Sequence, residues 1–278
     1  MELLSADVLR EKFLMIAHKQ YELNSQVNPE WFEARYPFYR ALWTEAAEAM
    51  AYFPWEWWKK RSMSETDKQQ LGLELADMLH FGVSMLLSEA MMPVVRHWQQ
   101  DDDDEAVSPA RETCFAMVAS SAAKAARYIM QDAATRLSDA DSLTYLPSHI
   151  ELVAKEALSR RFNLQALCRA ACALGIGVEG LIGLYFGKNV LNKFRQDHGY
   201  KTGEYIKNWR AAFGDGPEMM EDNIALAQIV ISMEESFSWA LPEGTTYLMF
   251  LGSHDYQKNL YNNLEAAYSN VLAGAGRL

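Results

Sequence analysis

Apolar residues recur at helical spacing along almost the whole chain, and no segment shows the alternation of polar and apolar residues that marks a strand. This pattern limits the fold to the all-α class, as a compact multi-helix bundle. No long linker divides the pattern, so the sequence predicts one domain over residues 1–278. The predicted helices cover about residues 5–24, 29–52, 65–91, 109–135, 151–174 and 177–197, with a short helix ending near residue 213 and two more after it.

Capping and helix-breaking residues set the expected ends of these helices. Asn28 and Pro29 suit the start of the second helix, and Pro54 ends it. The segment 64–67, Ser-Glu-Thr-Asp, suits the cap of the next helix. Solvated loops are expected at 101–105, 136–150, 199–203 and 214–217, which are rich in Asp, Ser, Pro or Gly.

Composition excludes several classes of protein. The net charge of −11 argues against a nucleic-acid partner, because general nucleic-acid binding favours basic surfaces. The chain begins without a secretory leader and has no apolar run of about 20 residues, so we expect a soluble, cytoplasmic or otherwise intracellular protein without a membrane partner. Cys114, Cys168 and Cys172 lack zinc-site spacing, and we expect buried free thiols.

Two pairs of carboxylates lie inside apolar helical segments, where acids are scarce. Glu45 and Glu48 form one pair, and Glu74 and Asp77 form the other. Residues three apart share a helix face, so two such helices packed side by side would bring four carboxylates together. Hard oxygen ligands at that density suit Mg²⁺ or Mn²⁺. The alternative is a solvated helix face. A di-iron site is disfavoured, because His80 supplies only one partial Glu-x-x-His match.

A basic segment at 185–209 stands out in this acidic chain. Lys188, Asn192 and Arg195 fall on one helical stripe and so present two cations and an amide to one object. A polyphosphate fits such a stripe, because Arg forks onto phosphate oxygens and Lys acts as a point charge. An ordinary solvated helix face is the competing interpretation.

A pair of primary amides, Gln20 and Asn24, shares one face of the first predicted helix. Amides offer both a donor and an acceptor, which suits them to read the edge of a nucleobase. Taken alone, the pair is more typical of polar surface residues.

Together these residues resemble the dimeric dUTPase family, within the all-α nucleoside triphosphate pyrophosphatase group. The most specific stretch is Lys-Asn-x-Leu-Asn-x-Phe-Arg-Gln-x-x-Gly-Tyr-Lys at 188–201. The resemblance covers the first 90 residues and about 175–235, where Glu221-Asp222-Asn223 also looks like a family element. Residues 93–150 match no motif of the family, and we interpret them as a family-variable helical insertion.

The resemblance implies Mg²⁺-dependent hydrolysis of dUTP, and also dUDP, to dUMP by a metal-activated water, in a homodimer. Two or three Mg²⁺ ions, with Mn²⁺ as a substitute, would be held by Glu45, Glu48, Glu74 and Asp77, and Glu48 would serve as the catalytic base or only as a ligand. The phosphates would bind to Lys59, Lys188, Asn192, Arg195, Tyr200, Lys201 and Lys207. The uracil and deoxyribose would bind to Gln20, Asn24, Trp58, His80 and Asn189. The loops at 199–203 and 214–217 would close over the nucleotide.

Two other functions stay open from the sequence. One is a related all-α pyrophosphatase of different base preference, for dCTP or for nucleoside triphosphates in general. The other is a helical interaction module without catalysis.

Overall fold

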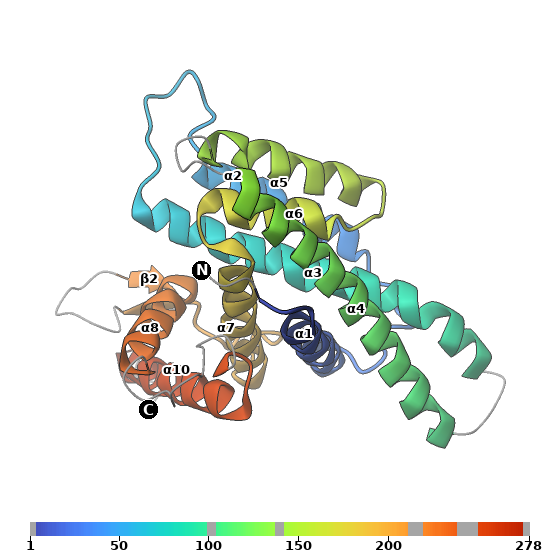
Figure 1. The fold of residues 1–278 in the computed structure, drawn as a ribbon. Helices are drawn as coiled ribbons and strands as arrows, with labels where there is room; N and C mark the ends of the chain where they lie inside the picture. The colour runs from blue at the N-terminus through green and yellow to red at the C-terminus, as the bar shows by residue number, and fades with distance from the viewer. Residues whose placement is uncertain (1–3, 99–103, 137–141, 211–218, 238–249, 275–278) are drawn as a thin grey trace. The chain divides into compact units, whose positions relative to one another are not determined.

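The computed structural model describes residues 4–98, 104–136, 142–210, 219–237 and 250–274, and these are mostly helical (Figure 1). The all-α prediction is therefore confirmed. The chain divides into two compact units, Met1–Tyr185 and Phe186–Leu278, which we describe separately. Because one helix runs through the boundary, the prediction of a single domain over 1–278 stays a prediction.

The first unit is built around a long central helix, α3. This helix contacts α1, α2, α4 and α6, while α4 also lies against α1, and α5 lies against α2 and α6 (Figure 1). The elements are α1 (Ala6–Val27), α2 (Phe38–Tyr52), α3 (Glu65–Trp98), α4 (Asp104–Arg136), α5 (Ser142–Leu158), α6 (Leu164–Leu174) and the start of α7 (Gly177–Asp197). Leu71, Leu75 and Leu79 of α3 are fully buried, which places the core of this unit around that helix.

Two predicted helix ends are confirmed by the hydrogen bonds at the caps. Ser64 Oγ accepts from the backbone N–H of Asp67, while Asp67 Oδ2 accepts from the N–H of Ser64, so α3 begins with a reciprocal cap. The helix α2 ends at Tyr52, two residues before Pro54.

The predicted start of the second helix at Pro29 is wrong. Asn28 caps the end of α1 instead, donating its backbone N–H to the Asn24 carbonyl. Residues 29–35 form turns, and Arg35 has a φ of 49°, which no helix accommodates. Because Pro37 disfavours helical backbone at the residue before it, α2 begins only at Phe38.

Three further predicted boundaries in the first unit are wrong. Pro109 lies inside α4 and not at its start. The expected loop at 136–150 is helical from Ser142 onward, as part of α5. The single helix predicted over 151–174 is broken, because Arg160 has a φ of 58° and the Asn163 side chain caps a new helix by accepting from Ala166 N–H.

The second unit contains the rest of α7, a small antiparallel pair of strands and two described helices. These are β1 (Asn208–Arg210), β2 (Met219–Glu221), α8 (Asp222–Phe237) and α10 (His254–Gly274). Trp209 pairs with Met220 in the strand register and is fully buried against Tyr268. The prediction of a short helix ending near residue 213 is therefore wrong at 208–210, which form a strand. The end of that predicted helix and the predicted loop at 214–217 lie outside the described residues. The turn predicted at 199–203 is confirmed.

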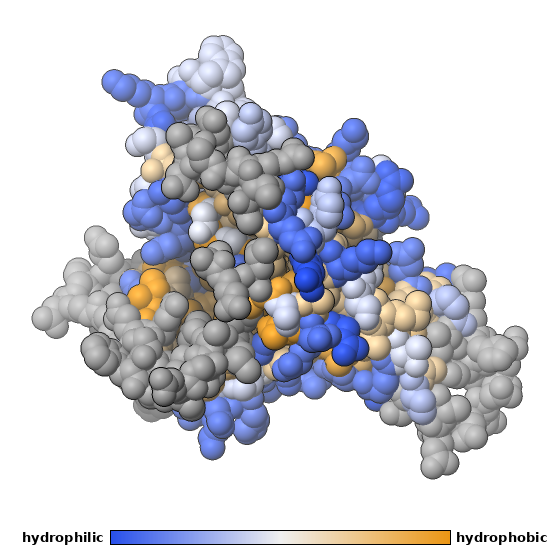
Figure 2. Space-filling model, viewed as in Figure 1, coloured by the Kyte–Doolittle hydropathy of each residue, from blue (hydrophilic) through white to orange (hydrophobic). Residues whose placement is uncertain are grey.

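The surface of the described residues is mostly hydrophilic in the view of Figure 2, with apolar side chains gathered in small patches. Within the described ranges, the segment Glu65–Pro93 of α3 is long and apolar enough to cross a membrane, and the bent pair α6 and α7 passes the same test together. An apolar stretch of 18 residues in this part of α3 is 72% buried inside the protein, which fits a core helix. The three cysteines are free thiols, with Cys114 and Cys168 buried and Cys172 half-buried.

Candidate active site

The packing of α2 against α3 brings acids from both helices together. Glu45 and Glu48 of α2 and Glu74 of α3 each offer a carboxylate oxygen, and these oxygens lie within 4.8 Å of one another. Glu74 is buried, Glu45 is half-buried and Glu48 is exposed, so the cluster reaches from the helix interface to solvent. The structure thus brings together three of the four predicted metal ligands.

The fourth predicted ligand, Asp77, acts on the same cluster through its charge. Burial, the negative charges of Asp77, Glu74 and Glu48, and a side-chain hydrogen bond with Glu74 together raise the pKa of the Glu45 carboxyl from 4.5 to about 8, with burial the largest cause. The cluster therefore holds more negative charge than its surroundings balance, and either a proton or a cation relieves the repulsion.

The donor set fits a divalent metal. All of the donor atoms are carboxylate oxygens, which Mg²⁺ and Mn²⁺ prefer to nitrogen or sulfur ligands. The oxygens come from two rigid helices, so their spacing does not depend on a loop. Glu45, Glu48 and Glu74 form a candidate site for a divalent metal ion.

A hydrogen-bonded chain of buried polar groups lies in the same unit. The Tyr185 hydroxyl oxygen lies 3.1 Å from both Gln20 Oε1 and the Ile16 carbonyl oxygen, and its single hydrogen is shared between these two acceptors. Gln20 Nε2 donates to Asn24 Oδ1 at 2.9 Å, and Asn24 Nδ2 donates to Ser84 Oγ at 3.0 Å. The direction of each amide is thereby fixed by its protein partners.

His80 lies next to this chain of hydrogen bonds. Its ring stacks on the Tyr185 ring with the centroids 4.1 Å apart. Its Nδ1 lies 2.9 Å from the Ala76 carbonyl, and because a carbonyl only accepts, Nδ1 carries the hydrogen. The predicted base-binding residues Gln20, Asn24 and His80 are thus joined through Tyr185, which sequence reasoning did not single out, and through Ser84, which it missed.

The predicted sugar-binding Trp58 lies in an exposed aromatic cluster. The Trp57 ring meets the Trp58 ring edge-on, as does the Trp55 ring, and all three side chains are exposed. The adjacent Lys59 forms an ion pair with Glu56 at 2.7 Å.

In the second unit, the predicted phosphate-binding side chains form a compact polar network. Arg195 forms an ion pair with Asp222 at 2.7 Å and donates to Asn192 Oδ1 at 2.9 Å. Lys188, only 1% exposed, donates to Asn223 Oδ1 at 2.9 Å. The sequence analysis identified Asp222 and Asn223 as part of a segment similar to the family, but predicted no role for either residue.

The other predicted residues of this unit are less closely held. Asn189 is buried on α7. Tyr200 is exposed, and the Arg195 guanidinium carbon lies 5.8 Å from the centre of its ring. Lys201 is exposed in the turn after α7, and Lys207 forms an exposed ion pair with Glu221 at 3.3 Å.

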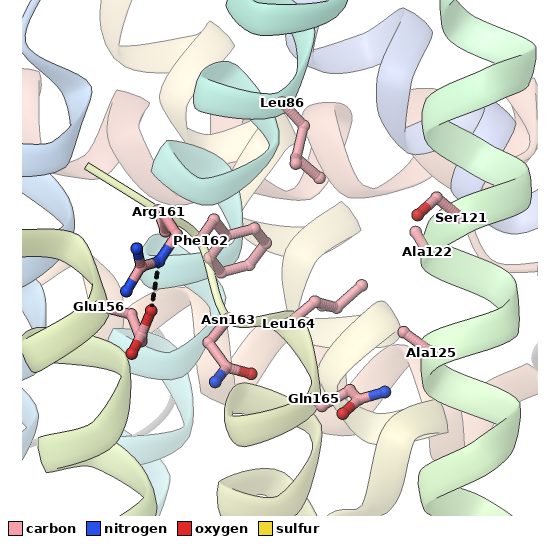
Figure 3. Close-up of a pocket in the computed structure, with 10 residues that line it drawn as sticks. All are labelled: Leu86, Ser121, Ala122, Ala125, Glu156, Arg161, Phe162, Asn163, Leu164 and Gln165. Carbon is pink, nitrogen blue, oxygen red and sulfur yellow. Dashed lines mark hydrogen bonds and ion pairs between the residues drawn. The ribbon is translucent and has the colours of Figure 1, made fainter. Parts of the chain in front are cut away.

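A separate cavity of about 310 Å³ lies in the first unit. Figure 3 shows Ser121, Ala122 and Ala125 of α4 on one side and the ion pair between Glu156 and Arg161 on the other. None of the predicted site residues lines this cavity.

The fold and the acid cluster define a class: all-α proteins with a carboxylate site suited to a divalent metal. A family model described as dUTPase matches residues 12–200, which is more than half of the chain. The chain therefore belongs to the family of dimeric, all-α dUTPases, which are dUTP diphosphatases, and it is an enzyme of the hydrolase class. No curated protein matches the chain.

The family match confirms the resemblance drawn from the motifs. It includes both acid pairs, the amide pair and the basic stripe of α7, and it also spans residues 93–150. Asp222 and Asn223 lie beyond its end. The family is typically metal-dependent and acts on nucleotides, in agreement with the carboxylate cluster.

Proposed function

We propose that this protein hydrolyses dUTP, and also dUDP, to dUMP in a Mg²⁺-dependent reaction. The observation that carries the proposal is the convergence of Glu45, Glu48 and Glu74 within 4.8 Å, in a chain that belongs to the dUTPase family. Mn²⁺ is the expected substitute, since it prefers the same oxygen ligands.

Glu45, Glu48, Glu74 and Asp77 are the proposed metal ligands. A divalent cation bound there supplies Lewis acidity, which polarises phosphoryl oxygens and lowers the pKa of water. Glu48 is the exposed member of the cluster, so its oxygens face the solvent from which the attacking water comes. We therefore assign Glu48 the role of accepting a hydrogen bond from that water and orienting it for attack.

The amides of Gln20 and Asn24 are the proposed readers of the uracil ring. Tyr185 and Ser84 fix the direction of both amides, so a base must match a set pattern of donors and acceptors. His80 and Asn189 complete the proposed base site, and Trp58 is proposed to contact the deoxyribose or the base.

Most of the proposed phosphate ligands are cationic side chains. Lys188 and Arg195 supply positive charge, and Asn192 supplies an amide on the same helix. Tyr200, Lys201, Lys207 and Lys59 are proposed to add further contacts.

The substrate assignment is tested by pyrophosphate release from dUTP, dCTP, dTTP and UTP in the presence of Mg²⁺. We expect dUTP to give the highest kcat/KM. A higher kcat/KM for any of the other three would contradict the assignment and identify a family member with another base preference.

The role of the acids is tested by Glu48→Gln and Asp77→Asn, with Glu33→Gln as a control at an exposed turn residue. We expect each of the first two variants to lower kcat by at least about a hundredfold and to weaken Mg²⁺-dependent thermal stabilisation by nucleotide. If both variants keep full activity, or gain stability without any loss of turnover, the carboxylates have no catalytic part.

A further inference from the structure

The buried side chains around Arg195 carry an inference about how that residue works. We propose that Asp222 and Tyr205 are positioning residues, which fix the Arg195 guanidinium in place for a phosphate group of the nucleotide. The inference rests on the proposed function, since a phosphate is its ligand, but it concerns residues that neither the family match nor the motif assigns to that role.

Asp222 accepts two hydrogen bonds from one edge of the Arg195 guanidinium. Arg195 Nε–H donates to Asp222 Oδ2 at 2.8 Å, and its Nη2–H donates to Asp222 Oδ1 at 2.7 Å. This bidentate arrangement fixes the plane of the guanidinium as well as its position. The Asp222 side chain is fully buried and that of Arg195 is 11% exposed, so water competes little for either group.

Asp222 is itself held from three sides. It is the first residue of α8, where the helix dipole favours a carboxylate. Its backbone N–H donates to the Lys207 carbonyl at 2.9 Å. The Tyr205 hydroxyl donates to Asp222 Oδ2 at 2.8 Å, and the Tyr205 ring stacks on Tyr268 of α10. The carboxylate therefore cannot follow Arg195 if that side chain swings toward solvent.

Two amides complete the restraint on Arg195. Its Nη1 donates to Asn192 Oδ1 at 2.9 Å and its Nη2 to Asn223 Oδ1 at 3.1 Å. The same oxygen of Asn223 accepts from Lys188 Nζ at 2.9 Å, so one amide sets the spacing of two cations.

This geometry has a consequence for how the phosphate is bound. A swing of Arg195 would break its hydrogen bonds and leave a buried carboxylate without its cation, which is costly. The guanidinium is therefore preorganised, and the phosphate comes to it. Because Asp222 balances part of the Arg195 charge, direction of hydrogen bonding contributes more to recognition here than net charge does.

The test is a double-mutant cycle on the full chain, with Tyr205→Phe and Arg195→Lys, scored by kcat and KM for dUTP. Tyr205→Phe keeps the stacked ring and removes only the hydroxyl that holds Asp222. We expect it to lower kcat/KM about tenfold, mainly through KM, because one charge-assisted hydrogen bond is lost. In the Arg195→Lys background the same change should alter kcat/KM less than about twofold, since the forked geometry is already gone.

Ligand binding provides a readout that does not depend on turnover. A non-hydrolysable dUTP analogue should bind to Tyr205→Phe about tenfold more weakly, whereas deoxyuridine, which has no phosphate, should bind unchanged. The matched control is Tyr261→Phe, which also removes a phenol hydroxyl from a ring next to Phe194, but that hydroxyl donates to Asp197. We expect Tyr261→Phe to keep the wild-type KM.

The outcomes separate this inference from the proposed function. If wild-type protein hydrolyses dUTP but Tyr205→Phe and Asp222→Asn both keep its KM and kcat/KM, the positioning role is overturned. Equal losses from Tyr205→Phe in both backgrounds, or equal weakening of deoxyuridine binding, would also overturn it in favour of a general effect on folding. A wild-type protein that neither binds nor hydrolyses dUTP overturns the proposed function, and this inference with it.

Discussion

The protonation of Glu45 depends on its burial and on its acidic neighbours. Its folded-state pKa, about 8, lies above its ordinary value of 4.5 because of burial and three nearby acids. A group with a raised pKa contributes stability that is fully present below about pH 4.5 and is lost as the pH rises through about 8. We therefore expect the metal-free protein to show a falling melting temperature between pH 5 and pH 8.

Glu45→Gln checks this sign. The variant cannot ionise at this position, so its melting temperature should fall less over the same pH range than that of wild type. Mg²⁺ at pH 8 should raise the melting temperature of wild type more than that of the variant, because the cation favours the ionised cluster. A wild-type melting temperature that rises from pH 5 to pH 8 without metal would contradict the raised pKa.

Tyr185 is the residue that the sequence placed only at the edge of the basic segment, although it holds the amide chain in the first unit. Tyr185→Phe leaves Gln20 Oε1 without its donor while keeping the ring that stacks on His80. We expect a loss of stability of about 1 kcal/mol and a rise of a few-fold in KM for dUTP with little change in kcat. Urea unfolding and steady-state kinetics measure the two effects, and an unchanged KM would show that Gln20 does not depend on this donor for substrate binding.

Periodicity and capping predicted some elements well and others poorly. The helix α7 begins and ends where the sequence placed it, and the reciprocal cap at Ser64 was visible as a motif. By contrast, Asn28 lies at a helix end where its residue type suggested a start, because its side chain accepts from the Glu30 N–H in a turn and does not cap a new helix. The turn at Arg160 was not predicted, since Arg160 adopts a positive φ that its residue type does not favour.

The small strand pair shows a second limit of local patterns. The segment 208–210 is too short for a period to be recognised, and its extended form depends on pairing with Met219–Glu221. That pairing also places Asp222 at the start of α8, directly after β2. The contact between Arg195 and Asp222 therefore depends on tertiary structure that the sequence does not reveal.

Gly82 of the central helix α3 lies close to the Phe162 ring. A Cβ there would clash with that ring, which belongs to the segment between α5 and α6. We expect Gly82→Ala to destabilise the protein by about 1–3 kcal/mol through overpacking, measured by urea unfolding.

The second change in this test makes room for the added methyl group. In the Phe162→Leu background, Gly82→Ala should cost less than it does in wild type, because the ring that meets the added methyl group is gone. If the cost is the same in both backgrounds, the contact between Gly82 and Phe162 does not set it.

At the scale of the whole molecule, the sequence predicted the residue types of the site better than their partners. The four acids were found because charged residues inside apolar helices are unusual, and α2 and α3 bring three of them within 4.8 Å. Ser84 and Asp222 were not assigned roles, because a lone Ser or Asp has no distinctive local pattern. Their contacts join residues 60 and 27 positions apart, and no local pattern encodes such distances.

The last prediction concerns assembly. The first unit exposes large apolar side chains on two helices, with Met117 and Tyr128 on α4 and Tyr145 and Leu158 on α5, and each is more than half exposed. Such side chains favour burial against a second protein surface. We propose a homodimer, in agreement with the family, and expect light scattering to give twice the chain mass of 31.6 kDa.

Charge insertion tests which surface is used. Met117→Glu combined with Tyr128→Glu should shift the mass toward 31.6 kDa, because two carboxylates would have to be desolvated in the interface. Gln69→Glu, at an exposed position of α3, is the matched control and should leave the dimer intact. A wild-type protein of 31.6 kDa at all concentrations would contradict the homodimer, whereas a dimer that resists both changes on α4 would show that this helix face lies outside the interface.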